Sequence, residues 1–219
     1  MHAILAGERD PQVLAQHRDY RCKHSAEVIA KSLVGNYRAE HLFALQQAVT
    51  LYAVYQAQIA ACDQQIEQYL ATFTPVCTAA PPPPKARQRR GNPFQFDAHT
   101  QLYRMTGVDL TQIDGIDTVT ALTVVSEIGL DMSRWKTVKH FPSWLRLCPE
   151  TKGSGGKVLS SKTKPTANRA ATALRIAAAS LYRSQSALGA YLRRMTAKLG
   201  KPEAITATAH KLARLVYSM

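Results

Sequence analysis

The chain has 219 residues, of which 46% are hydrophobic, and it carries 28 Lys and Arg against 15 Asp and Glu, a formal net charge of +13. This length and this apolar fraction allow a buried core of one or two domains, which excludes wholesale disorder, and there is no run of about 18 apolar residues that would span a membrane. The surplus charge lies entirely in residues 75–219 (22 basic and 8 acidic, against 6 and 7 in residues 1–74), so we expect nucleic acid as a partner of the second part.

Residues 1–35 are polar and mixed, and two short helices are expected within them. Asp10 followed by Pro11 fits the start of the first helix, since the carboxylate can accept a backbone N–H and proline has none to satisfy. The second helix is expected to begin at Ser25 and to end at Gly35.

A single long helix is predicted for residues 37–73, which contain no Gly and no Pro. Inner positions recur at alternating spacings of about three and four residues, a heptad seam that would run along a helix about 55 Å long. The seam positions are Leu42, Leu45, Val49, Tyr52, Gln56, Ile59, Asp63, Ile66, Leu70 and Phe73. This seam predicts self-association as a dimer or tetramer through a coiled coil, and its polar members Gln56 and Asp63 can fix the register. The alternative is a long amphipathic helix packed within its own domain.

Pro75 ends this helix, and residues 75–97 are expected to form a Pro-rich basic linker. Four consecutive prolines at positions 81–84 make a stiff, extended spacer. The basic cluster after them either contacts phosphate or is simply solvated; its members are Lys85, Arg87, Arg89 and Arg90. The linker would separate a first domain, residues 1–74, from a second, residues 98–219.

The second domain is predicted to be helical, which makes the fold class of the chain all-α. Helical periodicity recurs near residues 98–106, 117–128, 136–147, 168–198 and 202–217, and no segment shows the alternation of a strand bounded by turns. Residues 168–198 are expected to form one long helix. A short loop at Gly200, followed by Pro202, predicts that this helix and the last one form an antiparallel pair.

Residues 110–124 resemble a helix-hairpin-helix, in which a glycine-containing turn joins two helices and presents backbone N–H groups to a phosphate. Gly115 and Ile116 fit the turn and are candidate nucleic-acid contacts. Asp117 stands where a second glycine is usual, and although it makes a good N-cap, its charge would repel a phosphate. A plain helical hairpin packed into the core is the alternative interpretation.

A glycine-rich basic loop at residues 149–165 contains a candidate nucleophile, Ser154. Three glycines and two lysines surround this serine, namely Lys152, Gly153, Gly155, Gly156 and Lys157. Glycines let a backbone approach a ligand closely, and lysines can neutralise the charge that develops when a serine attacks a phosphodiester. The loop is not a P-loop, because Val158 follows Lys157 where Ser or Thr is required. From spacing alone, a mobile basic loop is the simpler interpretation.

The cysteines and histidines do not indicate a metal site. The four cysteines form no C-x-x-C pair, and the seven histidines are scattered without metal-ligand spacing. Because the N-terminus is charged too early for a secretion signal, we expect reduced thiols in a cytoplasmic protein.

Several blocks, in order along nearly the whole chain, resemble the RNA-guided, serine-dependent DEDD-type transposases of bacterial insertion sequences, the insertion sequence one-hundred-and-ten family. The blocks lie at residues 36–45, 55–63, 127–131, 141–149, 154–157 and 204–217, and they include Ser154-Gly155-Gly156-Lys157. The resemblance implies an RNase-H-like domain with four acidic metal ligands, then a coiled-coil helix, then a helical domain with a serine nucleophile. This chain resembles the last two parts only. The acidic domain is therefore expected to be missing, and no cofactor is expected in this chain, because Mg²⁺ would bind only with that domain.

By this resemblance Ser154 is the catalytic residue, which attacks a DNA phosphate and forms a phosphoserine link. Its glycine and lysine neighbours would shape the phosphate pocket. Further basic residues would hold the backbone of DNA or of a guide RNA, and these are Lys162, Lys164, Arg169 and Arg175. The expected function is that of the C-terminal part of a transposase in the bacterial cytoplasm, associated with the nucleoid and inactive on its own. The alternative is a non-catalytic nucleic-acid-binding remnant or regulator that oligomerises with full-length transposase.

Overall fold

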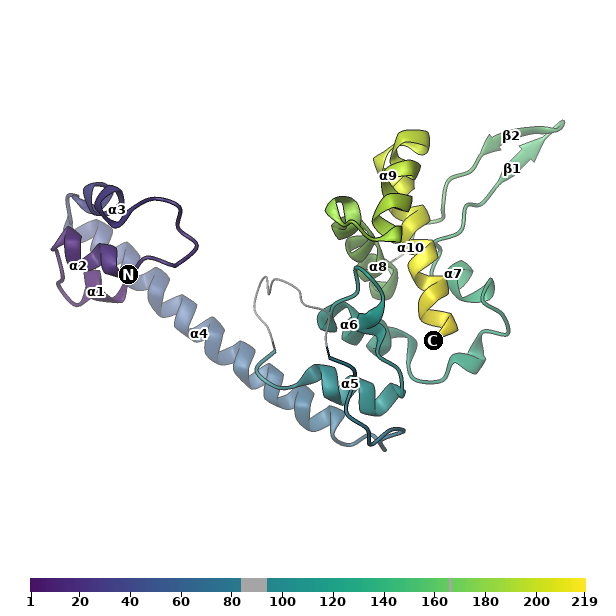
Figure 1. Ribbon diagram of the computed structural model, residues 1–219, viewed down its shortest axis with the longest axis horizontal. Coiled ribbons are helices and arrows are strands. Elements are labelled where there is room, and N and C mark those ends of the chain that lie inside the picture. The colour runs from purple at the N-terminus through teal and green to yellow at the C-terminus, as the bar shows by residue number, and fades with distance from the viewer. Residues whose placement is uncertain (84–93, 166) are drawn as a thin grey trace. The chain divides into compact units, whose positions relative to one another are not determined.

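The computed structural model describes residues 1–83, 94–165 and 167–219 (Figure 1). In these residues the secondary structure is helical apart from one two-stranded sheet, which confirms the all-α expectation. The chain forms two compact units, Met1–Gln65 and Ile66–Met219. The basic cluster of the predicted linker, at residues 85–90, lies outside the described residues. None of the described helices is long and apolar enough to cross a membrane.

The first unit contains three short helices, α1 (His2–Leu5), α2 (Pro11–Gln16) and α3 (Ala26–Leu33), and the first part of a long helix, α4 (Ala39–Leu70). Both predicted N-caps are confirmed. The Asp10 carboxylate accepts a hydrogen bond from the Gln12 N–H at 2.8 Å, and the Ser25 hydroxyl accepts one from the Val28 N–H at 3.4 Å. α2 and α3 pack on each other, so these two caps fix the directions of the helices that form the small core of this unit.

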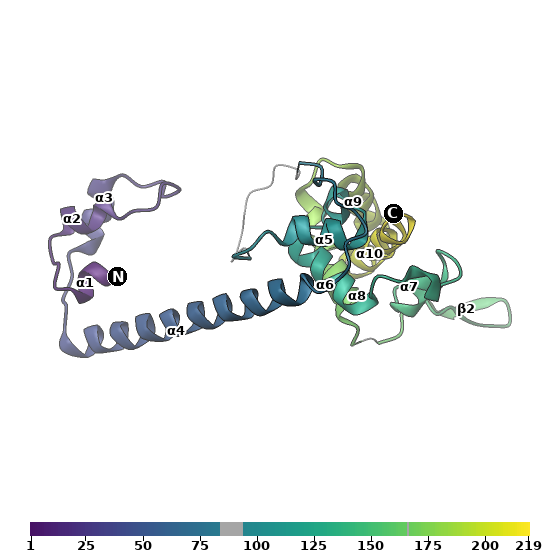
Figure 2. The same cartoon turned by 90° about the horizontal axis from the view of Figure 1, so that it is seen from below.

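Helix α4, drawn along its length in Figure 2, confirms the predicted long helix. Most of the predicted seam positions are at least half-buried, and Asp63 and Leu70 are each 6% exposed, whereas Tyr52 is 63% exposed. Large apolar and aromatic side chains outside the seam are exposed as well, namely Phe43, Leu51, Val54, Tyr55 and Tyr69. A helix with this much exposed apolar surface is typical of one that binds a partner. The coiled coil itself stays a prediction.

The second unit is a helical domain around one core. Its α-helices are α5 (Ala98–Thr106), α6 (Thr118–Ile128), α7 (His140–Trp144), α8 (Arg169–Ser180), α9 (Ala187–Leu199) and α10 (Lys201–Ser218), with 3₁₀ turns η1 (Leu110–Gln112), η2 (Met132–Arg134) and η3 (Leu181–Arg183). Helix α10 packs against α7, α8 and α9, and α6 packs against α8. Val124, Phe141, Leu174 and Leu212 are fully buried, so α6, α7, α8 and α10 share this core.

The prediction of one helix over residues 168–198 is wrong, because the chain bends between α8 and α9. The Ser186 hydroxyl caps α9 by accepting a hydrogen bond from the Gly189 N–H at 3.2 Å. A Cβ at Gly189 would lie 2.3 Å from the Ser184 carbonyl oxygen, so only glycine permits this close turn. The helix expected at 136–147 is also shorter, reduced to α7. The antiparallel pairing of the last two helices is confirmed, with Gly200 at φ +88° between them.

The absence of strands is the second expectation that the structure overturns. Strands β1 (Lys152–Ser154) and β2 (Lys157–Ser160) form an antiparallel hairpin that extends away from the helices (Figure 1). Gly155 and Gly156 connect them with φ of +57° and +75°, the two positive angles that a two-residue type I′ turn requires. Residues 151–157 are all exposed, so this stretch has no buried face that would produce an alternating apolar pattern in the sequence.

Candidate functional site

The hairpin presents Ser154 in an exposed position directly opposite a lysine. Ser154 is the last residue of β1, and its cross-strand partner is Lys157, the first residue of β2. Because directly opposed residues of an antiparallel pair point to the same face, the serine hydroxyl and the lysine ammonium lie on one side of the hairpin. A phosphate that approached this hydroxyl would therefore meet a cation at the same time.

Nothing within the described chain activates the serine. Among the described residues, the Ser154 hydroxyl makes no hydrogen bond to a histidine or a carboxylate. A serine hydroxyl is a weak nucleophile unless a base accepts its proton. The hairpin therefore places an exposed hydroxyl beside a cation, and no described residue hydrogen-bonds that hydroxyl as a base would.

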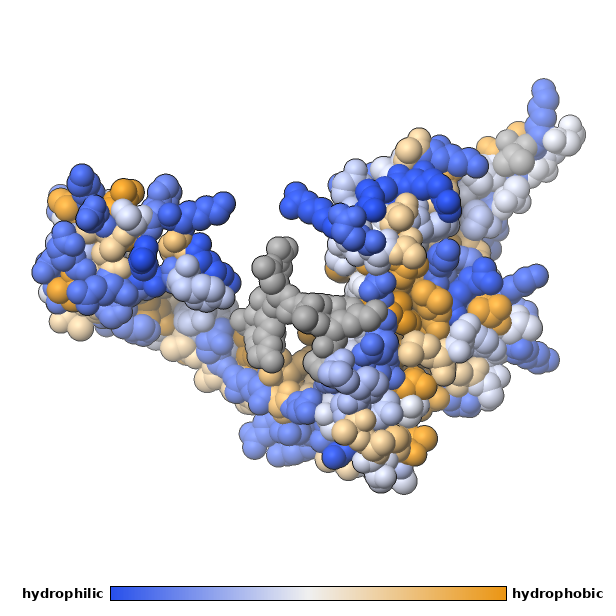
Figure 3. All heavy atoms as spheres, in the orientation of Figure 1, coloured by the Kyte–Doolittle hydropathy of each residue, from blue (hydrophilic) through white to orange (hydrophobic). Residues whose placement is uncertain are grey.

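The basic residues predicted around Ser154 fall into two groups. Lys152, Lys157 and Lys162 are exposed, and hydrophilic atoms project from the hairpin in Figure 3. Lys164 instead pairs with Glu150 at 3.0 Å, and Arg169 lies 3.5 Å from Glu127. Exposed pairs of this kind are weak and can be exchanged for a phosphate, but the first three lysines are the cations most available to a polyanion. The remaining predicted contact, Arg175, is half-buried on α8.

The turn at Gly115 and Ile116 packs against the core of the second unit. The Ile116 side chain is fully buried, and its N–H donates to the Ile113 carbonyl at 3.1 Å. A Cβ at Gly115 would lie 3.0 Å from Leu181 and 3.1 Å from the Ala177 carbonyl oxygen, so this turn packs against α8 and η3. This packing agrees with the alternative interpretation of a plain helical hairpin, and a phosphate contact through the backbone stays a prediction. Asp117 is the predicted N-cap of α6 and accepts the Thr120 N–H at 2.8 Å.

The described residues contain no ligand set for a metal ion. No three His, Cys, Asp or Glu side chains gather there, and the four cysteines are free thiols. The residues present therefore do not fit a magnesium site, whose carboxylate ligands must converge on one ion.

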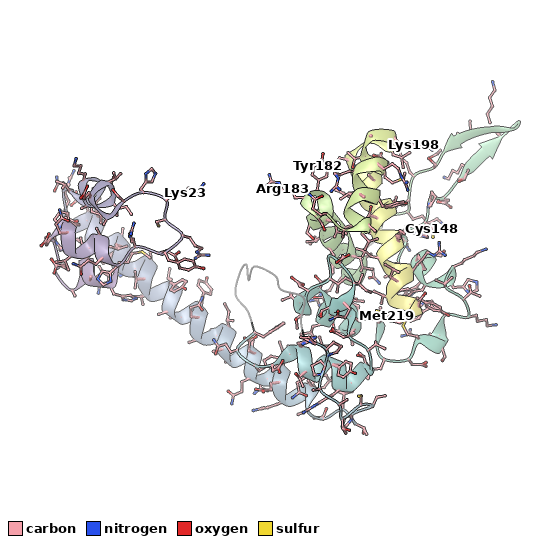
Figure 4. The ribbon with its side chains drawn as sticks, in the orientation of Figure 1. Lys23, Cys148, Tyr182, Arg183, Lys198 and Met219 are labelled. Atoms are coloured by element: carbon pink, nitrogen blue, oxygen red, sulfur yellow. The ribbon has the colours of Figure 1, made fainter. Side chains whose placement is uncertain are left out.

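A basic and aromatic cluster on α9 and α10 was missed by the sequence reasoning. The Lys211 ammonium lies 4.4 Å from the centre of the Tyr191 ring, and the Arg194 guanidinium lies 5.7 Å from it. Figure 4 shows that Lys198 extends from α9 and that Tyr182 and Arg183 extend from η3. The helical spacing of Tyr191, Arg194 and Lys198 was a signal for this face, but the position of Lys211 beside it depends on how α9 and α10 pack. A cation held over a ring in this way stays available to phosphate.

Residues 95–193 match the family model described as Transposase IS116/IS110/IS902 family. The match covers the region from α5 into α9 and therefore includes Ser154 and the whole hairpin. A search of curated proteins gives no match to the chain. The family match agrees with the resemblance drawn from the blocks at residues 127–131, 141–149 and 154–157, and this part of the chain is thus similar to a transposase domain.

Proposed function

We propose that this chain acts as the C-terminal part of an insertion-sequence transposase, that it binds DNA and a guide RNA, and that Ser154 is the nucleophile of strand cleavage and transfer. The observation that carries the proposal is the placement of Ser154 opposite Lys157 on an exposed hairpin. This hairpin lies within the segment that is similar to transposases. A structural serine would not need exposure, paired glycines or a cation across the strand.

The chemistry proposed is a phosphoryl transfer through a covalent intermediate. The Ser154 oxygen bonds to a DNA phosphorus, the bond from that phosphorus to one sugar oxygen breaks, and the released sugar takes a proton. The serine proton passes to a base on an acidic partner domain outside these 219 residues. Attack by a sugar hydroxyl of another strand then reverses the step and frees the serine. Lys157 would stabilise the charge on the phosphoryl oxygens during both steps.

Nucleic acid would be held by three cationic regions of the second unit. The first is the exposed lysines of the hairpin, and the second is the cluster of Arg194 and Lys211 around the Tyr191 ring. The third is Lys164 and Arg169, which would exchange their carboxylate partners, Glu150 and Glu127, for phosphates. Residues 169–219 contain nine Lys and Arg against one acidic residue, Glu203. This charge balance favours a long polyanion over a small anionic ligand. We further propose that α4 mediates self-association and that the protein acts in the bacterial cytoplasm at the nucleoid.

The experiment uses a reaction that contains element-end DNA, guide RNA, Mg²⁺ and a full-length transposase of this family whose own nucleophile has been removed. Adding the chain should restore strand transfer, and adding Ser154→Ala should not. Equal DNA affinity of the two proteins provides the control for folding. Restoration by Ser154→Ala would overturn the catalytic proposal.

The second candidate function is a non-catalytic regulator that binds nucleic acid and pairs with full-length transposase. It is favoured by the lack of a base beside Ser154 among the described residues and by the exposed apolar surface of α4. Under this alternative the chain lowers the activity of an intact transposase, and Ser154→Ala lowers it equally. The chain alone is expected to give no covalent DNA adduct under either function.

A further inference from the structure

Arg146 has a backbone conformation that arginine seldom adopts. Its φ is +54°, and no other non-glycine residue in the described ranges has a positive φ. The neighbouring residues Leu145 and Leu147 are 0% and 1% exposed, so the core holds the chain on both sides of it. A non-glycine residue remains in the left-handed region only where its surroundings impose it, and such residues concentrate near functional sites.

The Arg146 side chain connects the two ends of the segment that carries the hairpin. Its guanidinium donates a hydrogen bond to the Pro165 carbonyl oxygen, 19 residues further along the chain. Its own N–H donates to the Ser143 carbonyl at 2.9 Å, and the next N–H, that of Leu147, donates to the Pro142 carbonyl at 3.0 Å. One residue therefore ties the segment that returns from the hairpin, at Pro165, to the residues just after α7.

Few other contacts hold the hairpin to the domain. The segments that lead into and out of the two strands are joined by a bridge between Pro149 and Thr163, by the Glu150 N–H donating to the Lys162 carbonyl at 3.0 Å, and by the Glu150 to Lys164 ion pair. These contacts join one strand to the other, and none of them joins the strands to the core. Beyond them, residues 151–157 are exposed and pack on nothing that would fix their direction. The direction of the hairpin is consequently set at its base.

We propose that Arg146 is a positioning residue for Ser154: its hydrogen bond to Pro165 fixes the direction in which the hairpin presents the serine. The proposal rests on the proposed function in its second half, since positioning matters only if Ser154 reacts. Its first half, that Arg146 orders the hairpin, concerns the chain alone and is measured separately.

Hydrogen exchange on the intact chain tests the first half. Arg146→Gly removes the guanidinium but accepts the left-handed backbone, so the fold should keep its melting temperature. We expect the exchange rate of the Glu150 amide and of the hairpin amides to rise at least tenfold, with the amides of α8 and α10 unchanged. Arg146→Lys, which keeps one donor, should restore part of the protection. Lys136→Ala removes an exposed positive charge from an earlier part of the chain and should change nothing.

Two results would overturn the ordering role: unchanged exchange at Glu150 in Arg146→Gly, or a rise in exchange that spreads equally through α8 and α10. If Arg146→Gly does not fold, the same exchange measurement is made on Arg146→Lys and Arg146→Gln, and the same two results would overturn the ordering role. The second half is tested in the complemented strand-transfer reaction. There Arg146→Gly should lower the rate at saturating DNA by at least tenfold and leave DNA affinity unchanged, with partial rescue by lysine.

The two proposals fail differently. Full activity of Ser154→Ala would remove the proposed function and leave the exchange result standing. Full activity of Arg146→Gly, together with a mobile hairpin, would overturn the positioning role and leave Ser154 as nucleophile.

Discussion

At the scale of single residues, the Asp109 carboxylate shows how a buried charge is stabilised in this fold. It is 5% exposed, and it accepts hydrogen bonds from the Thr111 N–H at 3.0 Å, the Thr111 hydroxyl at 2.7 Å, the Gln112 amide at 2.8 Å and the His99 ring at 3.0 Å. Burial alone would raise the pKa of Asp109, but the hydrogen bonds from Gln112, Thr111 and His99 outweigh it and hold the pKa below its usual value. The network ties α5 to η1.

We predict that Asp109→Asn lowers the free energy of unfolding by about 1–3 kcal/mol at pH 7, because the amide replaces an acceptor-only group among donors. Because the pKa of Asp109 is lower in the folded chain than in the unfolded chain, its charged form stabilises the fold at pH values above the unfolded pKa, which is near 4. This stabilisation is lost as the pH falls through the pKa of the folded chain. Urea melts between pH 7 and pH 3 should therefore show less acid sensitivity in Asp109→Asn. The control Glu67→Gln, on the exposed side of α4, should stay within about 0.5 kcal/mol of the wild type. Equal acid sensitivity of Asp109→Asn and the wild type would contradict a lowered pKa of Asp109 in the folded chain.

At the scale of elements, the bend between α8 and α9 and the hairpin are the two features that position the basic surfaces. The bend depends on Gly189, which has no room for a Cβ beside the Ser184 carbonyl. The hairpin depends on its glycine turn and on contacts at its base. The bend and the hairpin thus each depend on a few backbone positions, and single substitutions at those positions test that dependence.

We predict that Gly189→Ala destabilises the second unit by about 1–3 kcal/mol through overpacking. Helix propensity alone gives the opposite sign, since alanine replacing glycine inside a helix usually stabilises by about 1 kcal/mol. The matched change in the same helix is Ala197→Gly at an exposed position, which should lose about 1 kcal/mol. Thermal melts compare the two. A stabilised Gly189→Ala would show that the bend does not need glycine.

The hairpin lysines should contribute directly to the electrostatic part of DNA binding. Replacing Lys152, Lys157 and Lys162 together by alanine should reduce the slope of log affinity against log salt by about 3, since each phosphate contact contributes about 0.9. Titration of a fluorescent duplex at several salt concentrations measures this slope. The control removes the same number of charges from the first unit, at Arg18, Lys23 and Lys31, and should leave the slope unchanged. Equal effects of the two triple variants would mean that binding is not localised to the hairpin.

The sequence predicted the helices of this chain better than its hairpin, and the reason is physical. Asp10, Ser25 and Asp117 are recognisable as caps because a side chain satisfies a nearby backbone N–H, which is a local interaction. Residues 151–157 of the hairpin are exposed, so no apolar periodicity indicated it. The bend before α9 and the packing of Gly115 against α8 depend on residues distant in sequence. For the site, Ser154 and its lysines were identified from composition and resemblance, whereas the face shared by Ser154 and Lys157 required the strand register.

At the scale of the whole molecule, charge and apolar surface are divided between two parts of the chain. Residues 1–74 carry 6 basic and 7 acidic side chains, while residues 75–219 carry 22 and 8. The long helix α4 exposes aromatic and aliphatic side chains such as Leu51, Val54 and Tyr55. The division suits a first part that assembles protein subunits and a second part that binds nucleic acid.

We predict that Val49→Glu together with Ile59→Glu dissociates a dimer or tetramer formed through the seam of α4, because two charges would enter an apolar interface. Light scattering after size exclusion gives the mass of each species. The matched control places the same charges on the opposite face of the helix, as Gln47→Glu together with Gln58→Glu, since both glutamines are exposed. This control should leave the mass unchanged. A wild-type chain that is monomeric at micromolar concentration would contradict self-association through this seam.

The central claim is that Ser154 forms a bond to DNA, and the most direct measurement is the identification of that bond by mass spectrometry. The chain, element-end DNA carrying a labelled phosphate, guide RNA, Mg²⁺ and the nucleophile-deficient full-length transposase are combined, quenched with denaturant and digested. We predict a phosphoserine-linked nucleotide on the peptide that contains Ser154, and no label on the chain in the Ser154→Ala reaction. A labelled Ser154→Ala chain, or a wild-type chain that supports strand transfer without carrying label, would contradict the account.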